Sequence, residues 1–448
     1  MRRFLVGSLW LSLLGSSHAL ATSASTDIFC QKYPKALGCE SKQASCAICH
    51  TAVPSLNAYG DDIKGALTGP IDATLIGALD KIEALDSDED GASNITEIEH
   101  HSAPGNGSIK PEADAQLAYD PVIAMRRLRA IYCGNPASYE DLQKVKTAAD
   151  PKAILHAELN KCLASPFWKG EALFRLADKK IQPLSAIGFG GNVVIADYRY
   201  DYRLFSYIMS DDHDVRELLS ANYHIDESGA RVEGVIARQE PAQVGQRIVI
   251  GGGQPLDPTR RAGMITTQWF LAFYTMFAPL PRNTASQTYR EYLGMDIAKG
   301  EGLMPVANEP RDVDARNVKQ ADCAVCHSTL DPLSYAFSTY VGIETVQAFL
   351  FNSNGTYRAT RQPWEAQGQL FGQPVTNLLD WATKARNSDP FKKNIANMFF
   401  KQALSRDPLP SEQGEFEALW KALPDDAYSA NKLIHRLIET KAFGGKRS

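Results

Sequence analysis

The chain has 448 residues, of which 44% are hydrophobic and 22% are charged, and its formal net charge is −5. These values are typical of a globular protein and exclude a largely disordered chain, a collagen-like fibre and a polytopic membrane protein. The acidic balance and the lack of a long basic run argue against nucleic acid as a partner. At roughly 100–200 residues per domain, the length predicts two or three domains.

The N-terminal segment has the pattern of a secretory signal peptide. Arg2 and Arg3 precede an apolar run over Phe4–Leu14, and Ala19–Ala21 supplies the small residues of a cleavage site. The run is too short to cross about 30 Å of hydrocarbon as a helix, and no later segment reaches about 18 consecutive apolar residues. We therefore expect residues 1–21 to be removed, and a mature chain without a membrane span in the periplasm or outside the cell.

Two C-x-x-C-H motifs are the most informative features of the sequence. One spans Cys46–His50 and the other spans Cys323–His327. Two thiols at this spacing reach the two vinyl groups of one porphyrin, and the adjacent histidine presents a ring nitrogen to the iron. The sequence therefore predicts two covalently bound haem c groups. Their predicted attachment residues are Cys46, Cys49, His50, Cys323, Cys326 and His327.

Two other uses of the C-x-x-C spacing fit less well. A thioredoxin-like dithiol needs a βαβ context, and neither motif has one. A zinc site would combine both cysteine pairs, but Cys46 and Cys323 lie in opposite parts of the chain, far beyond the usual ligand spacing. Haem attachment is the interpretation that we carry forward.

The remaining four of the eight cysteines form two local pairs. In an oxidising compartment they are expected to be disulfides. Three pairings of four cysteines exist, and we favour Cys30–Cys39 and Cys133–Cys162 because each closes a short loop.

The segment Asp86–Glu97 matches D-x-D-x-D-G-x₅-E, the twelve-residue calcium loop. Hard Ca²⁺ binds six to eight oxygens, and the loop offers four carboxylates, the Ala92 carbonyl and an amide. The alternative is an acidic surface loop without an ion. Because Ser93 replaces the usual aliphatic at the eighth position, we expect a single structural loop and not a paired sensor hand. The predicted side-chain ligands of one Ca²⁺ are Asp86, Asp88, Asp90, Asn94 and Glu97.

The pattern of apolar residues predicts a mainly α-helical fold, in which two cytochrome-c-like haem modules surround a helical middle domain with short β-segments. The expected boundaries are 22–110, 111–300 and 301–448. In the middle domain, Tyr198, Tyr200 and Tyr202 alternate as they would on one face of a strand. Helices are expected around residues 59–67, 124–131, 139–147, 170–177 and 263–277.

The second motif resembles a known family. Cys323–Phe337 is similar to the C-x-x-C-H-x-x-I-D-P-x-G-F-A-F segment of planctomycete-type cytochrome c proteins. Val215–Tyr223 resembles their R-E-L-L-x-A-x-Y element, and Arg261–Thr266 resembles their R-x-G-I-L-T element. Phe399–Arg406 and Leu433–Phe443 are similar to their closing helices. The resemblance covers about residues 120–448 and implies an exported, haem-bearing protein.

The chain departs from the family pattern at two positions, where Ser334 replaces a glycine and Met264 replaces an aliphatic residue. The N-terminal segment resembles small domains in which C-x-x-C-H is followed by D-x-D-G-D-G-x-x-N. It has the character of a module fused in front of the family segment.

The sixth ligand of each iron decides between electron transfer and chemistry at an open iron. For the first haem we predict His100 or His101, because no methionine occurs between His50 and Met125. For the second haem we predict Met304, and an open site stays a second interpretation. Weaker candidates for that position are Met264, Met295, Met398, His213 and His224.

Two complete haem motifs without a catalytic constellation predict a dihaem c-type cytochrome that transfers single electrons. Its partner would be a redox protein or a small-molecule electron donor or acceptor. The alternative is a dihaem peroxidase or oxygenase with an open second haem, and a third interpretation is a secreted binding or structural protein. The sequence leaves the redox potentials, the substrate and the oligomeric state open.

Overall fold

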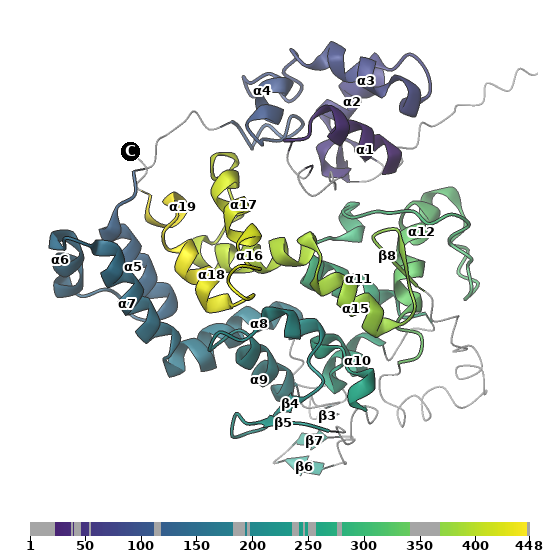
Figure 1. Ribbon diagram of the computed structural model, residues 1–448. Coiled ribbons are helices and arrows are strands. Elements are labelled where there is room, and N and C mark those ends of the chain that lie inside the picture. Colours follow the sequence, from purple (N-terminus) through teal and green to yellow (C-terminus); the bar gives the residue numbers. More distant parts are fainter. Residues whose placement is uncertain are drawn as a thin grey trace, which may run out of the picture.

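The protein is described by a computed structural model, in which the chain is mainly helical with short strands between the helices (Figure 1). The predicted signal peptide, residues 1–21, lies outside the described residues. No helix among the described residues has the length and apolar character that a bilayer span requires. The structure describes residues 23–36, 39, 46–52, 55–111, 118–181, 193–194, 198–234, 242–244, 247–249, 257–275, 280–340 and 368–445.

Residues 23–111 fold around a small hydrophobic core of their own, which we call the N-terminal module. Its core includes Phe29, Tyr59, Leu79 and Ile98, one from each of four helices. The predicted disulfide Cys30–Cys39 is confirmed and closes the turn after the first helix. The elements of the module are α1 (Ser23–Lys32), η2 (Cys46–Ile48), β1 (His50–Ala52), β2 (Ser55–Leu56), α2 (Ala58–Ala66), α3 (Ile71–Ile82) and α4 (Asn94–Glu99).

Residues 118–445 share a second, larger core that extends from Ala124 to Phe443 and fully buries Trp168 and Trp381. We call this part the body, and the predicted disulfide Cys133–Cys162 within it is also confirmed. Its α-helices are α5 (Pro121–Tyr132), α6 (Tyr139–Thr147), α7 (Pro151–Leu163), α8 (Leu173–Ile181), α9 (Arg199–Ile208), α10 (Gln268–Thr275), α11 (Arg282–Leu293), α12 (Ala321–Tyr335), α15 (Leu378–Arg386), α16 (Asp389–Leu404), α17 (Gln413–Lys421), α18 (Ala430–Leu437) and α19 (Lys441–Gly444).

Short non-α helices and small sheets connect these helices. The three-stranded sheet has the order β3-β7-β6, and the other pairs are the antiparallel β4–β5 and β8–β9. The strands are β3 (Val193–Val194), β4 (His224–Ile225), β5 (Arg231–Val232), β6 (Ala242–Val244), β7 (Arg247–Val249), β8 (Gly368–Leu370) and β9 (Gln373–Val375). The short helices are η3 (Trp168–Ala172), η4 (Val215–Leu219), η5 (Pro258–Arg260), η6 (Gly263–Thr266), η7 (Ile297–Lys299) and η8 (Pro410–Glu412).

The boundary predicted at residue 300 does not separate two cores in the described residues. Helix α11, on its N-terminal side, packs against both α12 and α16, on its C-terminal side. Side chains from both sides of residue 300 belong to the same buried cluster. The middle and C-terminal regions therefore fold together.

The tyrosine stretch is helical, so the prediction of a strand there is wrong. Tyr200 and Tyr202 belong to α9, and Tyr198 precedes its first turn. Their alternation over five residues fits a helix as well, because positions i and i+4 share a helical face. The rings of Tyr198 and Tyr202 accordingly lie 6.0 Å apart, and Phe205 and Ile208 continue the buried face.

The predicted helices near 59–67, 124–131 and 139–147 are confirmed as α2, α5 and α6. The segment 170–177 is divided between a π-helical turn, η3, and α8. The segment 263–277 is also divided, because Thr267 is extended between η6 and α10, and residues 276–277 lie outside the described residues.

Substitution of Gly263 is expected to destabilise the body. Gly263 has a φ of +58°, and a Cβ there would lie 2.2 Å from the backbone oxygen of Leu218 in η4. Gly263→Ala should therefore cost at least about 2 kcal/mol and lower the Tm by several degrees. Gly414→Ala in α17, where a Cβ meets nothing within 4 Å, should hold or raise the Tm. Thermal melts followed by circular dichroism test the pair, and equal Tm values would contradict the expectation.

Candidate functional site

The first C-x-x-C-H motif is held by the start of α2. The Nδ2 amide of Asn57 donates to the carbonyls of Ala47 at 3.2 Å and Ile48 at 2.9 Å. The same side chain caps α2, since its Oδ1 accepts a hydrogen bond from Gly60 N. At Gly60 a Cβ would lie 2.0 Å from the Cys49 backbone oxygen, so only glycine lets α2 approach the motif this closely.

A cavity of about 270 Å³ lies beside this motif. Ile48 of the motif lines it, together with Phe29, Ile98 and Ile109 of the N-terminal module. Lys393 of α16 completes the lining from the body, so the module and the body meet here. Its mainly apolar lining beside C-x-x-C-H is the kind of surface on which one face of an apolar macrocycle would pack, so the residues that line it suit such a group.

The cysteines of the two motifs are thiols, whereas the other four form disulfides. Burial raises the pKa of the Cys49 thiol to about 12. Burial also raises the pKa of Cys46, and the nearby Cys326 and Glu301 act in the same direction. The first motif therefore lies within electrostatic reach of the second, although the two are far apart in sequence.

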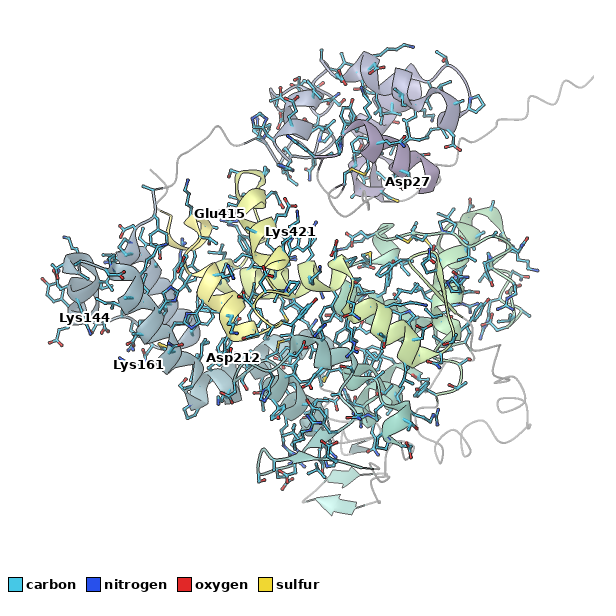
Figure 2. All side chains as sticks on the ribbon, viewed as in Figure 1. Asp27, Lys144, Lys161, Asp212, Glu415 and Lys421 are labelled. Atoms are coloured by element: carbon cyan, nitrogen blue, oxygen red, sulfur yellow. A yellow bond between two sulfur atoms is a disulfide. The ribbon has the colours of Figure 1, made fainter. Side chains whose placement is uncertain are left out.

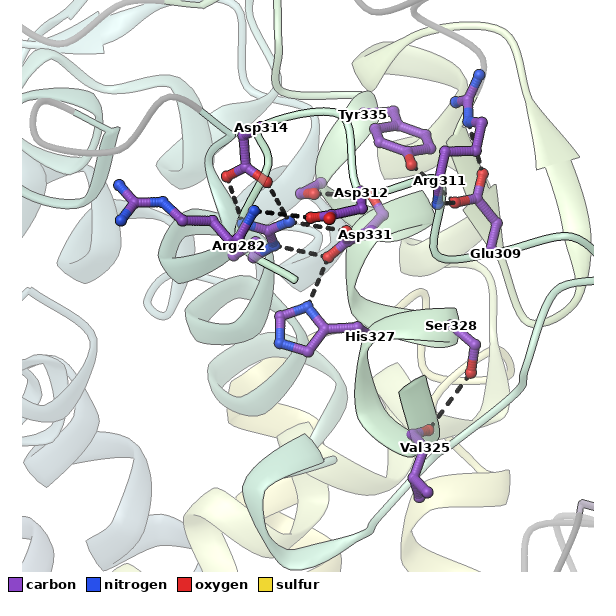
Figure 3. Close-up of polar contacts among 12 residues, drawn as sticks. Arg282, Glu309, Arg311, Asp312, Asp314, Val325, His327, Ser328, Asp331 and Tyr335 are labelled. Atoms are coloured by element: carbon purple, nitrogen blue, oxygen red, sulfur yellow. Dashed lines mark hydrogen bonds and ion pairs between the residues drawn. The ribbon is translucent and has the colours of Figure 1, made fainter. Parts of the chain in front are cut away.

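The second motif lies on α12, where a buried carboxylate orients its histidine (Figure 3). The Nδ1 of His327 is 2.8 Å from Oδ1 of Asp331, one helical turn later, and Asp331 is 0% exposed. A carboxylate only accepts, so Nδ1–H donates and Nε2 keeps its lone pair for an iron. The pair thus fixes the orientation of the ring and leaves Nε2 available as a metal ligand.

Arg282 of α11 balances the charge of Asp331. Its Nε and one terminal nitrogen donate to Asp331 at 2.6 and 2.8 Å, and its terminal nitrogens also donate to Asp314 at 2.6 and 2.9 Å (Figure 3). Burial alone would lower the pKa of Arg282, but its hydrogen bonds to the two carboxylates outweigh it and raise the pKa. Helices α11 and α12 are thus joined by a charged network that ends at His327.

The predicted ligand Met304 lies alongside α12. Its backbone N–H donates to Thr329 Oγ1 at 2.9 Å, and Val306 N donates to Ser328 O at 3.1 Å. Among the weaker candidates, Met264 and Met295 are buried in the core. His213 directs its Nδ1 at two backbone carbonyls, 2.8 Å from each. Of these candidates, Met304 therefore belongs to the segment that packs along α12, the helix of the second motif.

His100 and His101 follow α4 directly. His100 is exposed, and its Nδ1 lies 2.7 Å from Thr96 O, whereas His101 is half-buried with a φ of 56°. Ile98 and Ser102 of the same segment line the cavity, but neither histidine is among its described lining residues. A ligand role for either histidine stays a prediction. His50 itself is half-buried at the start of β1.

Three carboxylates of the predicted calcium loop come together, and the fourth, Glu97, is within reach of their charges. Oxygens of Asp86, Asp88 and Asp90 lie within 4.8 Å of one another. Glu97 of α4 is 0% exposed, and in the described part of the chain no hydrogen bond of normal distance and angle reaches its two carboxylate oxygens or those of Asp88, although the Ser102 side chain acts to lower the pKa of Glu97. Burial, followed by the charges of Asp88 and Asp90, raises the pKa of Glu97 to about 8. Buried carboxylates without such hydrogen bonds fit a hard cation such as Ca²⁺.

Asn94 is directed away from this cluster. Its Nδ2 donates to Ile82 O at 2.8 Å and to Ser87 Oγ at 2.9 Å, and its Oδ1 accepts from Ser87 N at 3.3 Å. The side chain therefore ties the end of α3 to the start of the loop. The geometry gives Asn94 a supporting position and not the ligand position that we predicted from the motif.

Comparison of the chain with protein-family models, with curated proteins and with solved structures finds no match. The functional argument therefore depends on the residues themselves. Sequence analysis missed Asn57, Lys393 and the pair of Asp331 and Arg282. Of these, only Asp331 has a local signal, because it lies four residues after His327 in a stretch that forms a helix.

Without calcium, stability should fall as pH rises from about 4.5 to about 8. The folded pKa of Glu97 is about 8 and its ordinary value is 4.5, so in this window the folded chain binds more protons than the unfolded chain. The free energy of unfolding then decreases with pH. Circular dichroism melts in a chelator at pH 5 and pH 8 measure the effect on the Tm.

Calcium should remove this loss, and at 100 times its Kd it should stabilise the chain by about 2.7 kcal/mol. Glu97→Gln should abolish both the pH dependence and the response to calcium. Glu99→Gln changes an exposed carboxylate on the same helix and is the matched control. A Glu97→Gln protein that responds like the control would refute the role given to Glu97.

Proposed function

We propose that this chain is an exported dihaem c-type cytochrome of the planctomycete type, which transfers single electrons between redox partners. The observation that carries the proposal is the division of the eight cysteines. Four are paired in disulfides, while the four thiols all belong to C-x-x-C-H motifs. Disulfides are typical of an oxidising compartment, which supports export.

The residues of each motif have separate tasks in this proposal. Cys46 and Cys49 would hold one haem, and Cys323 and Cys326 the other, through thioether bonds. A bound haem supplies a one-electron iron couple. His327 would present its Nε2 as the axial ligand, because Asp331 fixes its tautomer and ring orientation.

The arrangement of the two motifs supports electron transfer within one chain. Cys326 contributes to the raised pKa of Cys46, so the two motifs lie near each other in the fold. Lys393 brings a positive charge from the body into the cavity of the N-terminal module, where it would pair with a haem propionate. The module would then deliver electrons to the body, or receive them from it.

We propose one Ca²⁺ held by Asp86, Asp88, Asp90 and Glu97, with a structural task. Ser102 N donates to Glu97 O at 2.7 Å, and Lys110 Nζ donates to Asp90 O. The segment between them includes residues that line the cavity beside the first motif. A cation in the loop would thus fix one wall of the proposed haem site.

A second candidate function is a dihaem peroxidase or oxygenase, and the His327–Asp331 pair is the observation that favours it. A buried carboxylate on Nδ1 makes the histidine a more basic ligand. A more basic ligand stabilises oxidised iron, which suits reactions with peroxide or dioxygen at an open second site.

Haem content and electron paramagnetic resonance together test the proposal. The exported protein should carry two covalent haems, and Cys46→Ser/Cys49→Ser or Cys323→Ser/Cys326→Ser should each leave one. Two low-spin signals in the oxidised protein support electron transfer. One high-spin signal with rapid peroxide turnover would move the assignment to the second candidate, and a protein without covalent haem would refute both.

Asp331→Asn should raise the midpoint potential of the second haem by tens of millivolts. The Asp331 charge stabilises the oxidised state through His327. A change of about 1 kcal/mol in the free-energy difference between oxidised and reduced haem corresponds to roughly 40 mV for one electron. Spectroelectrochemical titration measures the shift. Asp314→Asn is the control, since it disturbs the same Arg282 network but keeps Asp331 beside His327. An equal shift in both variants would mean that the network acts only through packing.

A further inference from the structure

Two histidines meet on the body, outside the proposed haem and calcium sites. His156 lies on α7 and His435 on α18, two helices in contact (Figure 1). Their Nδ1 atoms are 2.6 Å apart and face each other, with the ring centroids 4.9 Å apart and the ring planes at 24°. Nothing in the proposed electron-transfer function uses this pair.

The other nitrogen of each ring is engaged by the opposite helix. His156 Nε2 lies 2.6 Å from Oε1 of Glu439, and His435 Nε2 lies 2.8 Å from Oδ1 of Asn160. Asn160 follows His156 by four residues on α7, and Glu439 follows His435 by four residues after α18. His435 is therefore oriented by an acceptor on α7, and His156 by an acceptor in the turn after α18.

These acceptors determine the tautomers of both rings. A carboxylate oxygen and an amide oxygen only accept, so both Nε2 atoms carry the proton. A neutral imidazole has one N–H, and both Nδ1 atoms are then left with a lone pair. With the tautomers in this arrangement, the two Nδ1 lone pairs face each other at 2.6 Å, a distance that a shared proton or a bound cation between the rings would account for.

We propose that His156 and His435 bind one divalent transition-metal ion of the Zn²⁺ or Cu²⁺ class through their Nδ1 atoms. Imidazole is a preferred ligand of these ions, and a ligating histidine usually donates its other N–H to a carboxylate or carbonyl oxygen. With metal–nitrogen bonds of about 2.0–2.1 Å at a tetrahedral angle, the two Nδ1 atoms would lie about 3.3 Å apart. They would therefore move apart by less than about 1 Å from their distance of 2.6 Å. Solvent reaches the pair, since the His156 side chain is 30% exposed, so water completes the coordination.

The surrounding charges favour a cation here. Asp212, labelled in Figure 2, and Glu439 both act to raise the pKa of His435, against burial and His156, which lower it. Asp212 is held in place by the Ser429 hydroxyl. Lys152 balances one oxygen of Glu439, 3.2 Å away, and leaves the other for His156. The bound ion would clamp α7 to α18 and so join the middle region to the C-terminal helices.

Metal binding to the intact holoprotein tests this proposal. With both haems attached and Ca²⁺ in excess, titration with Zn²⁺ should fill one site and raise the Tm. His156→Ala and His435→Ala should each abolish that site. Glu439→Gln keeps an acceptor oxygen but loses the charge, and should weaken binding roughly 10–100-fold.

Cu²⁺ identifies the ligands directly. Its electron paramagnetic resonance signal should show coupling to two nitrogens in the wild type and to fewer in either alanine variant. The matched control is Lys161→Ala, which removes a side chain of α7 that is 72% exposed and paired with Glu158. A wild type that binds no ion, or a His435→Ala protein that binds as tightly, overturns the proposal. Neither result bears on haem content, so the proposed function is tested separately.

Discussion

The buried carboxylate of Asp331 is the constraint on which the second motif depends. An ionised carboxylate that is 0% exposed survives only if its charge and lone pairs are satisfied, and Arg282 supplies both. Removing one partner of such a pair costs roughly 3–5 kcal/mol, because the other charge is left buried and uncompensated. The position of His327 is therefore determined by the packing of α11 on α12, and not by the motif alone.

The first motif is built on a different principle. Its backbone carbonyls are held by the neutral amide of Asn57, and Gly60 lets α2 lie directly on Cys49. The buried carboxylate of the module, Glu97, lies instead in α4, at the end of the acidic loop. One haem motif thus has a charged network behind its histidine, while the other has an apolar cavity beside it. Under the proposed function, haems bound at these two sites would differ in midpoint potential for this reason.

Local patterns predicted much of what the structure contains. The spacing of Cys30 and Cys39 and of Cys133 and Cys162 was enough for both disulfides, and helical periodicity was enough for α2, α5 and α6. The prediction of a strand at the tyrosine stretch was wrong, because a period of two over five residues does not distinguish a strand from a helix. Lys393 and Arg282 could not be predicted, since nothing local in the sequence says which distant helix faces a motif.

The shared core of residues 118–445 explains why the second motif is not an isolated module. Arg282 comes from the region before residue 300, and it is the counterion of the carboxylate that orients His327. A C-terminal fragment that begins near residue 300 would keep the whole C-x-x-C-H sequence and lose this arginine. The N-terminal module differs, because its core is its own and its motif is held by residues within it. The two C-x-x-C-H motifs are therefore supported by two different cores, one in the body and one in the module.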